Sequence, residues 1–247
     1  MLEYHHVLAE EGRWARSTKN FRADLERLYK LGYRPVTLAE YLENRIKIAP
    51  GASPVVITFD DSHPNQFYIL KDGRIDPNSA VGIWRDFAAT HPDFPVKATW
   101  FVVPNMAFGQ PRLFGKKLKM LQSWGSEIGS HTLSHGDLGK MTDDQVRKEI
   151  GGSIQKLKSF GVEVKTLAFP YGVPPKNRVL AKELIWNGTR YKLNGAVLAG
   201  SGPARAPTDQ KLRRFSIPRI QAIGGDYGIT YWLNKAKAGE YKLYVAP

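Results

Sequence analysis

The sequence contains no cysteine among its 247 residues, and this absence removes several functional classes at once. Disulfides, thiolate metal sites and a cysteine nucleophile are excluded, so any metal ligands must be oxygen or imidazole. The sequence also has no 18-residue apolar stretch and no charged leader followed by an apolar run after Met1. We therefore expect a soluble chain without a transmembrane segment, in which a removed leader or lipid anchor would leave no trace.

Acidic residues are few, since 23 Asp and Glu stand against 36 Lys and Arg, for a net charge of +13. Such a surplus attracts polyanions, which include nucleic acids, anionic cell-wall polymers and membrane surfaces. The basic residues are scattered, for example at Lys116, Lys117, Lys119, Arg213 and Arg214, and they form no recognisable nucleic-acid motif. We interpret the charge as favouring solubility and association, with an anionic cell-wall polymer as a partner and no specific nucleic acid.

The stretch from Val55 to Asp61, with the sequence V-V-I-T-F-D-D, is the most informative part of the chain. Its run of β-branched and aromatic residues predicts a strand buried on both faces, as in a parallel sheet covered by helices. The run ends at Asp60 and Asp61, and ligands in such proteins bind at the carboxyl ends of strands. Adjacent carboxylates repel each other, so a shared cation or proton would stabilise them. Alternatively, one acid caps a turn and the other is solvated.

A second group of ligand-type residues is the pair His131 and His135 in the sequence S-H-T-L-S-H. A spacing of four residues lets two imidazoles in a helical turn or a tight loop reach one ion. Two imidazoles and one carboxylate would hold a tetrahedral zinc ion with one open position, which is typical of catalytic sites. Cobalt or nickel would also suit these ligands.

Thr58-Phe-Asp-Asp61, followed by His131-Thr-Leu-Ser-His135, resembles the first two motifs of the polysaccharide deacetylases, carbohydrate esterase family 4, also called the NodB homology domain. The turn Pro170-Tyr-Gly172, which follows an expected strand, resembles the third motif. The resemblance covers the chain from about Tyr4 to about Ile220. It implies a metal-dependent hydrolase of carbon–nitrogen bonds that removes N-acetyl groups from a glycan.

The resemblance also implies roles for individual residues. Asp61, His131 and His135 would bind the divalent ion, which polarises the acetyl carbonyl and activates a water. Asp60 would act as the general base, although a free aspartate has a pKa of about 3.9 and needs to lie close to the reacting water. Because the proline before it has no N–H, the amide of Tyr171 is the first free donor after the strand and would bind the oxyanion.

The general acid is expected near the N-terminus. In most members of the family this histidine follows a late strand, but here no histidine follows His135. In the branch that deacetylates poly-N-acetylglucosamine-type polymers, it comes from an N-terminal Tyr-His element, which Tyr4-His5 resembles. We assign the role to His5, with His6 as the alternative, because adjacent residues of a strand point to opposite faces.

Two further positions depart from the family pattern. The usual glycine after the aspartate pair is Ser62, which affects only a turn. The arginine that usually precedes the Pro-Tyr turn, where it holds the catalytic acid, is missing from Leu167-Ala-Phe169. We expect Arg219, or failing that Arg214, to orient Asp60 from a later strand. The alternative is that Arg219 is an ordinary surface residue.

Several other residues are expected to belong to the scaffold or the groove. We predict that His63 is solvated and that Glu127 is structural. The loops 62–77 and 104–115 are predicted to form the walls of the substrate groove. Four tryptophans are predicted to lie in the core rather than to bind sugars: Trp84, Trp100, Trp186 and Trp232.

The chain alternates between expected strands and helices, which favours one α/β domain over residues 1–247. Expected strands are centred on Val55, Val96, Glu127, Val164, Ala196 and Phe215, with a last strand over 241–245. Expected helices carry Phe21 to Tyr29, start at the caps Thr37, Asn78 and Thr142, and cover 117–124, 178–186 and the region of Tyr231. A distorted barrel of about seven parallel strands, the (β/α)7 type of the family, fits this order.

Three functions from different classes are therefore compared. The first is a metal-dependent polysaccharide N-deacetylase of the cell envelope or the extracellular space. The second, which the missing arginine and late histidine keep open, is a non-catalytic or weakly active envelope protein that binds glycan. The third is nucleic-acid binding through the +13 charge, which predicts a steep salt dependence. The joint motif match favours the first over net charge alone.

Overall fold

Seven parallel strands close into a barrel at the centre of the structure, a computed structural model that describes residues 1–240 and 243–247. Around the ring they are β1 (Leu2–Tyr4), β5 (Ser53–Phe59), β6 (Thr99–Val102), β7 (Glu127–Ser130), β8 (Thr166–Ala168), β11 (Gly195–Ser201) and β12 (Ile217–Gln221). The ring closes because β1 pairs with β12 on one side and with the second half of β5 on the other. The expected distorted (β/α)7 barrel is confirmed.

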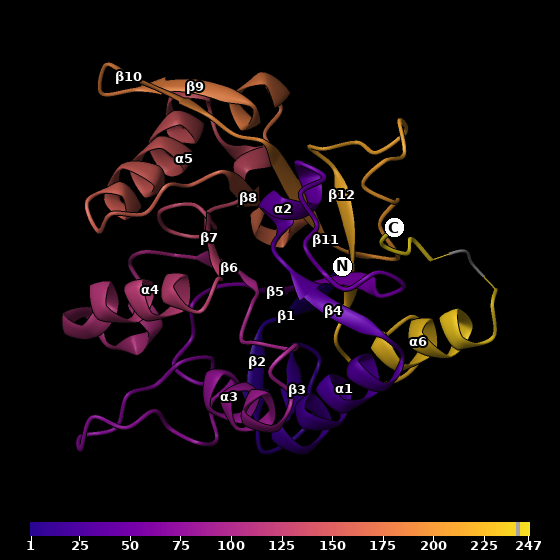
Figure 1. Cartoon of the computed structure of the whole chain (residues 1–247). Helices are drawn as coiled ribbons and strands as arrows, with labels where there is room; N and C mark the ends of the chain where they lie inside the picture. The colour runs from indigo at the N-terminus through magenta and orange to yellow at the C-terminus, as the bar shows by residue number, and fades with distance from the viewer. Residues whose placement is uncertain (241–242) are drawn as a thin grey trace.

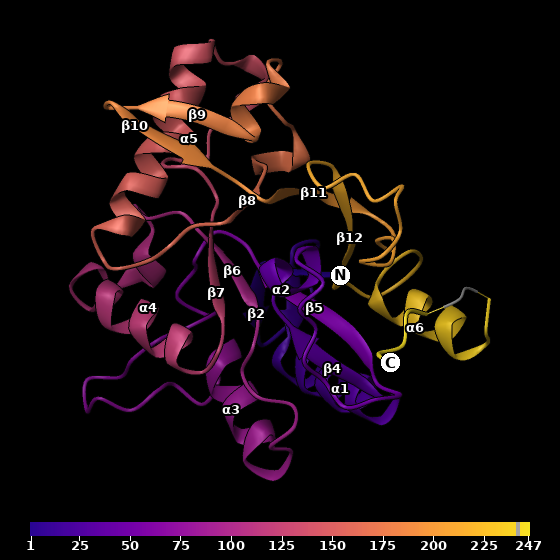
Figure 2. The same cartoon turned by 45° about the horizontal axis from the view of Figure 1, so that its top comes forward.

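Helices are spread around this ring, with β9 and β10 lying beside α5 (Figures 1 and 2). They are α1 (Thr18–Lys30), α2 (Leu38–Leu42), α3 (Ala80–Thr90), α4 (Phe114–Ser123), α5 (Asp143–Lys158) and α6 (Ile229–Lys237). Single 3-10 turns occur at Ala107–Gly109, Pro111–Leu113, Leu138–Lys140, Pro170–Gly172 and Arg178–Ala181. The capping boxes predicted at Thr37 and Thr142 are both present. Within the described residues, no helix has the length and apolar composition needed to cross a bilayer.

Five short strands complete the fold outside the ring. The strand β4 (Tyr33–Val36) pairs with the first half of β5. Next to β1, the strands β2 (His6–Leu8) and β3 (Ala15–Ser17) form a small parallel sheet. The hairpin β9 (Glu183–Trp186) and β10 (Thr189–Lys192) packs on α5.

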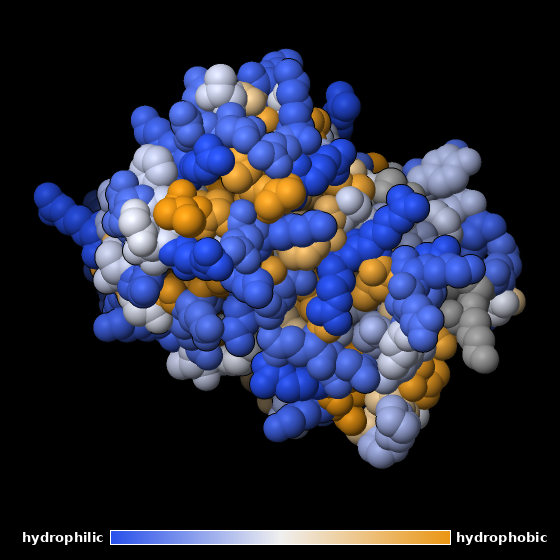
Figure 3. Space-filling view, turned by 90° about the horizontal axis from the view of Figure 1, so that it is seen from above, coloured by the Kyte–Doolittle hydropathy of each residue, from blue (hydrophilic) through white to orange (hydrophobic). Residues whose placement is uncertain are grey.

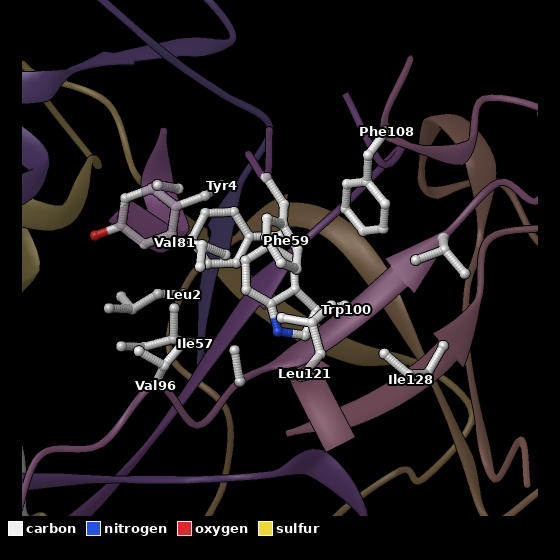
Figure 4. Packing of buried hydrophobic residues seen from close by; sticks show 14 of the residues in the cluster. Leu2, Tyr4, Ile57, Phe59, Val81, Val96, Trp100, Phe108, Leu121 and Ile128 are labelled. Carbon is white, nitrogen blue, oxygen red and sulfur yellow. The ribbon is translucent and has the colours of Figure 1, made fainter. Parts of the chain in front are cut away.

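Side-chain alternation along the strands separates two cores. On β5, Ile57 and Phe59 point outward to the helices, whereas Val56 belongs to a smaller apolar cluster inside the barrel. Figure 4 shows the outer core, where the Phe59 ring stacks on Trp100 at 4.3 Å between ring centroids. Because the side-chain period of a strand is two, Thr58 and Asp60 follow Val56 on the inner face. The Asp60 side chain thus lies over the carboxyl end of the barrel.

The amino end of the barrel is closed by α2, and Glu127 holds this helix in place. Leu38, Tyr41 and Leu42 of α2 belong to the inner apolar cluster. The Glu127 carboxylate accepts hydrogen bonds from the Ala39 amide and from the hydroxyls of two threonines on neighbouring strands, at 2.6–2.9 Å. Glu127 is therefore structural, as predicted.

Four details of the prediction are wrong. Residues 178–186 form a 3-10 turn followed by β9, not a helix, because the segment packs as a hairpin against α5. The third helix is capped by Ser79, whose hydroxyl accepts from the Gly82 amide, rather than by Asn78. Residues 243–245 of the expected last strand are not in a strand, and 241–242 lie outside the described residues. His5 and His6, which were expected to share one strand, do not, because β1 ends at Tyr4 and β2 begins at His6.

Candidate functional site

The backbone around the carboxyl end of the barrel departs from regular structure at several positions. Ten non-glycine residues have a positive φ in the described part of the chain, and five of them lie here: Asp61, Ser62, Thr132, His135 and Tyr171. Left-handed backbone costs energy for residues with a Cβ, and such strain clusters at functional sites. At Asp61 and Ser62 the chain turns sharply out of β5, so the two adjacent carboxylates can face one site from different directions.

Asp61, His131 and His135 come together as the sequence predicts. Oδ1 of Asp61 lies 3.3 Å from Nε2 of His131 and 3.2 Å from Nε2 of His135. One ligand atom from each residue lies within 4.8 Å of the other two. These distances suit three ligands that share one cation.

The surroundings hold both imidazoles in a ligand orientation. Nδ1 of the buried His131 donates to the carbonyl of Ala168 at 2.9 Å, which leaves Nε2 with its lone pair toward Asp61. The loop before His135 is tied to α5, because the Glu149 carboxylate accepts from the Ser134 amide and hydroxyl at 2.9 and 2.7 Å. Oδ1 of Asp61 is buried and has no hydrogen-bond partner, as expected of an atom that ligates a cation.

Asp60 is held by Arg219, which confirms the expected contact. Arg219 is completely buried, so the surface alternative is wrong. Its Nη1 and Nη2 donate to the two carboxylate oxygens of Asp60 at 2.7 Å each, and its Nε donates to the Leu198 carbonyl. The other candidate, Arg214, is exposed and precedes β12. Its carbonyl accepts from the amide of Ala196, at the amino end of β11 and away from Asp60.

A third carboxylate, that of Glu3, completes the charged cluster and was not predicted. Glu3 is buried on β1, and its Oε2 accepts from the Gly200 amide at 2.7 Å. Its Oε1 has no hydrogen-bond partner and lies 3.5 Å from Nη2 of Arg219. Three carboxyl groups, from Glu3, Asp60 and Asp61, thus surround the single guanidinium of Arg219. Two of their oxygens, Oε1 of Glu3 and Oδ1 of Asp61, are buried without a hydrogen-bond partner, so the donor set fits a divalent cation.

The pKa values of these groups reflect burial on one side and neighbouring charges on the other. Burial opposes ionisation of Asp60, but the Arg219 guanidinium and the imidazoles outweigh it and lower the pKa of Asp60 below its usual range. Interactions with His131 and His63 likewise overcome burial and lower the pKa of Asp61. Burial disfavours the charged form of His131, yet the carboxylates of Asp60 and Asp61 raise its pKa. Because an imidazole that ligates a metal must be neutral, protonation of His131 and cation binding compete at this position.

His5, the expected general acid, lies beside the carboxylates of Asp60 and Glu3. Its Nε2 is 4.0 Å from Oδ2 of Asp60 and 3.7 Å from Oε1 of Glu3, and its side chain is 15% exposed. Both His5 and His6 line the hollow above the site, so the expectation that only one of them faces it is wrong. Strand alternation does not apply, since the strand is interrupted at His5.

The hollow has a volume of about 210 Å³ and is bordered by exposed aromatic rings. Tyr171 is 66% exposed and packs edge-on against His135, and Trp14 is 42% exposed and lies against His5. The amide of Tyr171 has no hydrogen-bond partner among the described residues. The lining residues are His5, His6, Trp14, Asp60, Asp61, His131, His135, Phe169, Tyr171 and Ala199.

Neither loop predicted to wall the groove lines this hollow. The segment 62–77 instead packs Phe67 and Ile69 into the outer core, and Lys117 of α4 donates to the carbonyls of Phe67 and Phe108, one from each loop. Trp84 and Trp100 are fully buried and Trp186 and Trp232 pack on the core, as predicted. Trp14 had no signal in the sequence, because its place depends on the pairing of β2 with β3.

His63 contacts the site, so its prediction as a solvated residue is wrong. Its Nε2 lies 3.1 Å from Oδ2 of Asp61, and its ring stacks on His6 at 3.9 Å between centroids. Asn65 holds His6 through Nδ1 at 2.9 Å. Gln66, also unpredicted, is buried and donates from Nε2 to the carbonyls of His5 and Asp60 at 2.5 Å each. The carbonyls of the expected acid and base are thus tied to each other.

Comparison with known proteins agrees with this geometry. Residues 47–185, more than half of the chain, match the family model described as polysaccharide deacetylase. A 91-residue stretch, 36% of this chain, is 34% identical to a gellan lyase from Bacillus sp., and it spans only 3% of that relative.

Three solved structures share the fold over 94% of this chain. The Streptococcus pyogenes deacetylase PplD in complex with acetate is 21% identical, with a TM-score of 0.70 over 95% of its length. IcaB from Ammonifex degensii is 18% identical, with a TM-score of 0.59 over 95%. A de-N-acetylase from Aggregatibacter actinomycetemcomitans is 14% identical, with a TM-score of 0.64 over 97%. Through its matching residues and its barrel, this chain belongs to the polysaccharide deacetylase family.

Proposed function

We propose that this protein is a metal-dependent hydrolase that removes N-acetyl groups from an amino-sugar polysaccharide, with residues 1–247 as one catalytic domain. The observation that carries the proposal is the meeting of Asp61, His131 and His135 at the base of a hollow that also holds Asp60 and His5. Family membership supports deacetylation of a polysaccharide. Among the similar structures, one is described as a de-N-acetylase and another contains acetate.

Asp61, His131 and His135 would hold the cation, and zinc suits two imidazoles and one carboxylate, with cobalt or nickel as alternatives. When bound, the cation supplies Lewis-acid polarisation of the acetyl carbonyl. The Ala168 carbonyl binds Nδ1 of His131, and His63 contacts Oδ2 of Asp61. Both contacts orient the ligand atoms, Nε2 of His131 and Oδ1 of Asp61, toward the position of the cation.

Asp60 accepts the proton of the water that attacks the acetyl carbon. Arg219 uses both carboxylate oxygens of Asp60 for hydrogen bonds, which fixes the plane of the base. Each oxygen keeps a second lone pair for the water, and the closeness of that water offsets the weak basicity of an ionised aspartate.

The Tyr171 amide donates to the oxyanion as the carbonyl carbon becomes tetrahedral. Its left-handed φ of 59° is held by the Pro170–Gly172 turn. His5 then protonates the amine nitrogen of the sugar, which is a poor leaving group without that proton. Its ring nitrogen lies 4.0 Å from Asp60, so the base and the acid reach the same small volume.

Two contacts support catalysis over the alternative of a non-catalytic glycan-binding protein. That alternative rested on the missing arginine before the Pro-Tyr turn and on the missing late histidine. Arg219 comes from β12 and His5 from the end of β1, and both contact the Asp60 carboxylate. A complete set of base, acid, oxyanion donor and metal ligands favours catalysis.

Acetate release from N-acetylglucosamine oligomers and from peptidoglycan tests the proposal, with the metal content of the purified protein measured in parallel. We expect release by the zinc-loaded protein and none by Asp60→Asn at equal zinc content. Binding of the oligomers without release at full metal occupancy would support the glycan-binding alternative instead. Action on a cell-envelope polymer also implies an extracellular or envelope location, which fractionation of cells producing the full protein would test.

A further inference from the structure

Six basic side chains from distant parts of the chain surround two adjoining hollows outside the catalytic site. One hollow, of about 290 Å³, is lined by Arg178, Lys182, Arg213 and Arg214 among others. The second, of about 580 Å³, is lined by Arg205, Lys211 and again Arg213. The hollows share Arg213 and Ser216, so they adjoin, and together they are called the basic groove.

The positive charge of the basic groove is largely uncompensated. Within the described residues, no aspartate or glutamate lines either hollow. Arg205 pairs with Asp209 at 2.9 Å, whereas the other five cations have no carboxylate oxygen within 4.0 Å in the described part of the chain. All six side chains are exposed. Like charges gathered without counter-ions repel one another, so a ligand with several anionic groups would bind favourably.

The apolar and aromatic residues that line the basic groove distinguish between classes of polyanion. The apolar residues of the larger hollow are Pro203, Leu212 and Pro218. The only aromatic residues that line the basic groove among those described are Phe169, which is buried, and Phe215, which is half-buried with the Lys182 amine 5.8 Å from its ring centroid. No exposed ring is therefore offered to a nucleobase, and stacking is what single-stranded nucleic-acid sites rely on.

A membrane surface is also a poor fit. None of the exposed large apolar residues lines these two hollows. Seen from above, the face over β9, β10 and the segment before β12 is mostly hydrophilic, with small separate apolar areas (Figure 3). Insertion into lipid needs a broad apolar face next to the basic residues.

We propose that the basic groove binds an acidic polysaccharide, with sugar carboxylates on the guanidinium groups and sugar ring faces on the proline and leucine side chains of the lining. Four of the six cations are arginines, whose planar donors match carboxylates bidentately. The groove is a second site, because Phe169 is the one residue that lines both it and the catalytic hollow. It gives a location to the anionic polymer that net charge alone predicted.

Binding of polygalacturonate in about 0.15 M salt, where long-range surface charge is largely screened, tests this proposal. The test variant is the double substitution Arg213→Glu with Arg214→Glu, in which only backbone carbonyls of these residues make described hydrogen bonds. The matched control is Lys116→Glu with Lys119→Glu, two exposed lysines on α4 that bring the same change in net charge. Neutral dextran and a DNA duplex serve as further ligands.

We expect the wild type and the α4 control to bind polygalacturonate within threefold of each other, the groove variant to bind at least tenfold more weakly, and dextran not to bind. Equal losses in both variants, or no binding by the wild type, would overturn the proposal and leave only net charge. DNA binding that is tighter than polygalacturonate binding and lost selectively in the groove variant would assign the groove to nucleic acid.

This test does not depend on the proposed catalytic function, since it measures binding alone. Acetate release from neutral N-acetylglucosamine oligomers should be unchanged in the groove variant, which also shows that the variant folds. A further outcome is that the wild type and both variants all fail to release acetate while the groove variant alone binds polygalacturonate more weakly. In that case the deacetylase proposal fails and the groove proposal stands.

Discussion

Two buried aspartates in this protein each accept two hydrogen bonds from one arginine, yet only one of them lines the hollow. Outside the barrel, Asp24 of α1 accepts from Nε and Nη2 of Arg16 at 2.8 and 2.7 Å and from the Tyr4 hydroxyl. Inside it, Asp60 accepts from both terminal nitrogens of Arg219. Burial raises the pKa of Asp24, whereas the pKa of Asp60 is lowered because imidazoles add to its arginine.

The difference shows that an arginine–carboxylate pair does not by itself identify a catalytic base. Asp24 also accepts from the Tyr4 hydroxyl and does not line the catalytic hollow, so its hydrogen bonds tie α1 to β3 through Arg16 and to β1 through Tyr4. Asp60 faces an open volume and lies 3.8 Å from Nε2 of His131 and 4.0 Å from Nε2 of His5. Access to the hollow and contact with titratable partners separate the two.

The comparison is tested most directly by removing each carboxylate charge in turn. Asp60→Asn should lower kcat for acetate release by about 10²- to 10⁴-fold, the usual contribution of a general base. Asp24→Asn should leave kcat within a few-fold and act on stability instead. Steady-state acetate release at saturating zinc, with thermal unfolding of both variants, provides the measurement. A comparable loss of kcat in both variants would remove the distinction.

Removing each arginine sharpens the comparison in terms of stability. Arg219→Leu and Arg16→Leu each leave a buried carboxylate without its partner, so each should lower the free energy of unfolding by about 3–5 kcal/mol. Only the Arg219 variant should also lose acetate release when assayed well below its unfolding temperature. Urea unfolding followed by circular dichroism measures the free energy of unfolding of each variant. A stable Arg219→Leu protein with full activity would show that Asp60 needs no orienting partner.

A smaller effect is expected from His63, because among the proposed metal ligands it contacts only Asp61, through the carboxylate oxygen that faces away from the imidazoles. His63→Leu should weaken zinc binding by about 10- to 100-fold, as is usual for groups that support a metal ligand. His63→Gln, which can restore a donor, should recover part of the loss. The control is His91→Leu at the end of α3, where His91 stacks on Phe87 far from the site. Competition with a chelating dye measures affinity without reference to activity, and equal affinities in all variants would contradict a supporting role.

The smallest expected effect is a change in how stability depends on pH, and it comes from Lys117. This buried lysine has no carboxylate partner within the described residues. Its amine donates to two carbonyls, and desolvation lowers the pKa of Lys117 to about 7 from 10.5. Between these pH values the unfolded chain binds a proton that the folded chain does not, so stability should rise with pH by up to about 1.4 kcal/mol per unit. Lys117→Met should lack this component. Urea unfolding from pH 7 to 10 tests it, and parallel pH profiles for both proteins would argue against the shift.

The meeting of the proposed metal ligands could be predicted because their positions follow from local rules. Asp61 and His131 end β5 and β7, which are separated only by β6, and parallel strands bring their carboxyl ends to one edge. Their spacing along the chain does not matter once both strands are recognised. His135 follows within one loop, so its side chain stays in reach. Residue type and strand direction predicted that the aspartate pair and the histidines meet, and the resemblance to the family singled out Asp61 as the ligand.

The residues around the base were harder to predict, because their positions depend on ring closure. Glu3, His5 and Arg219 reach Asp60 only because β1 inserts between β5 and β12. Arg219 and His5 were chosen by resemblance and by elimination, and Glu3 was missed. His63, Gln66 and Trp14 were also missed, since their contacts are set by a left-handed turn and by a two-strand sheet that hydrophobic patterns do not reveal.

The sequence by itself determined the alternating architecture, the zinc-type donor set and the aspartate pair, because strand period, helix capping and ligand chemistry are properties of short segments. Only the tertiary structure decided which arginine binds Asp60, that both N-terminal histidines face the hollow, and that dispersed cations line one groove. These outcomes require segments up to two hundred residues apart to become neighbours, and the free energy that selects such neighbours comes from packing the whole barrel rather than from any local pattern.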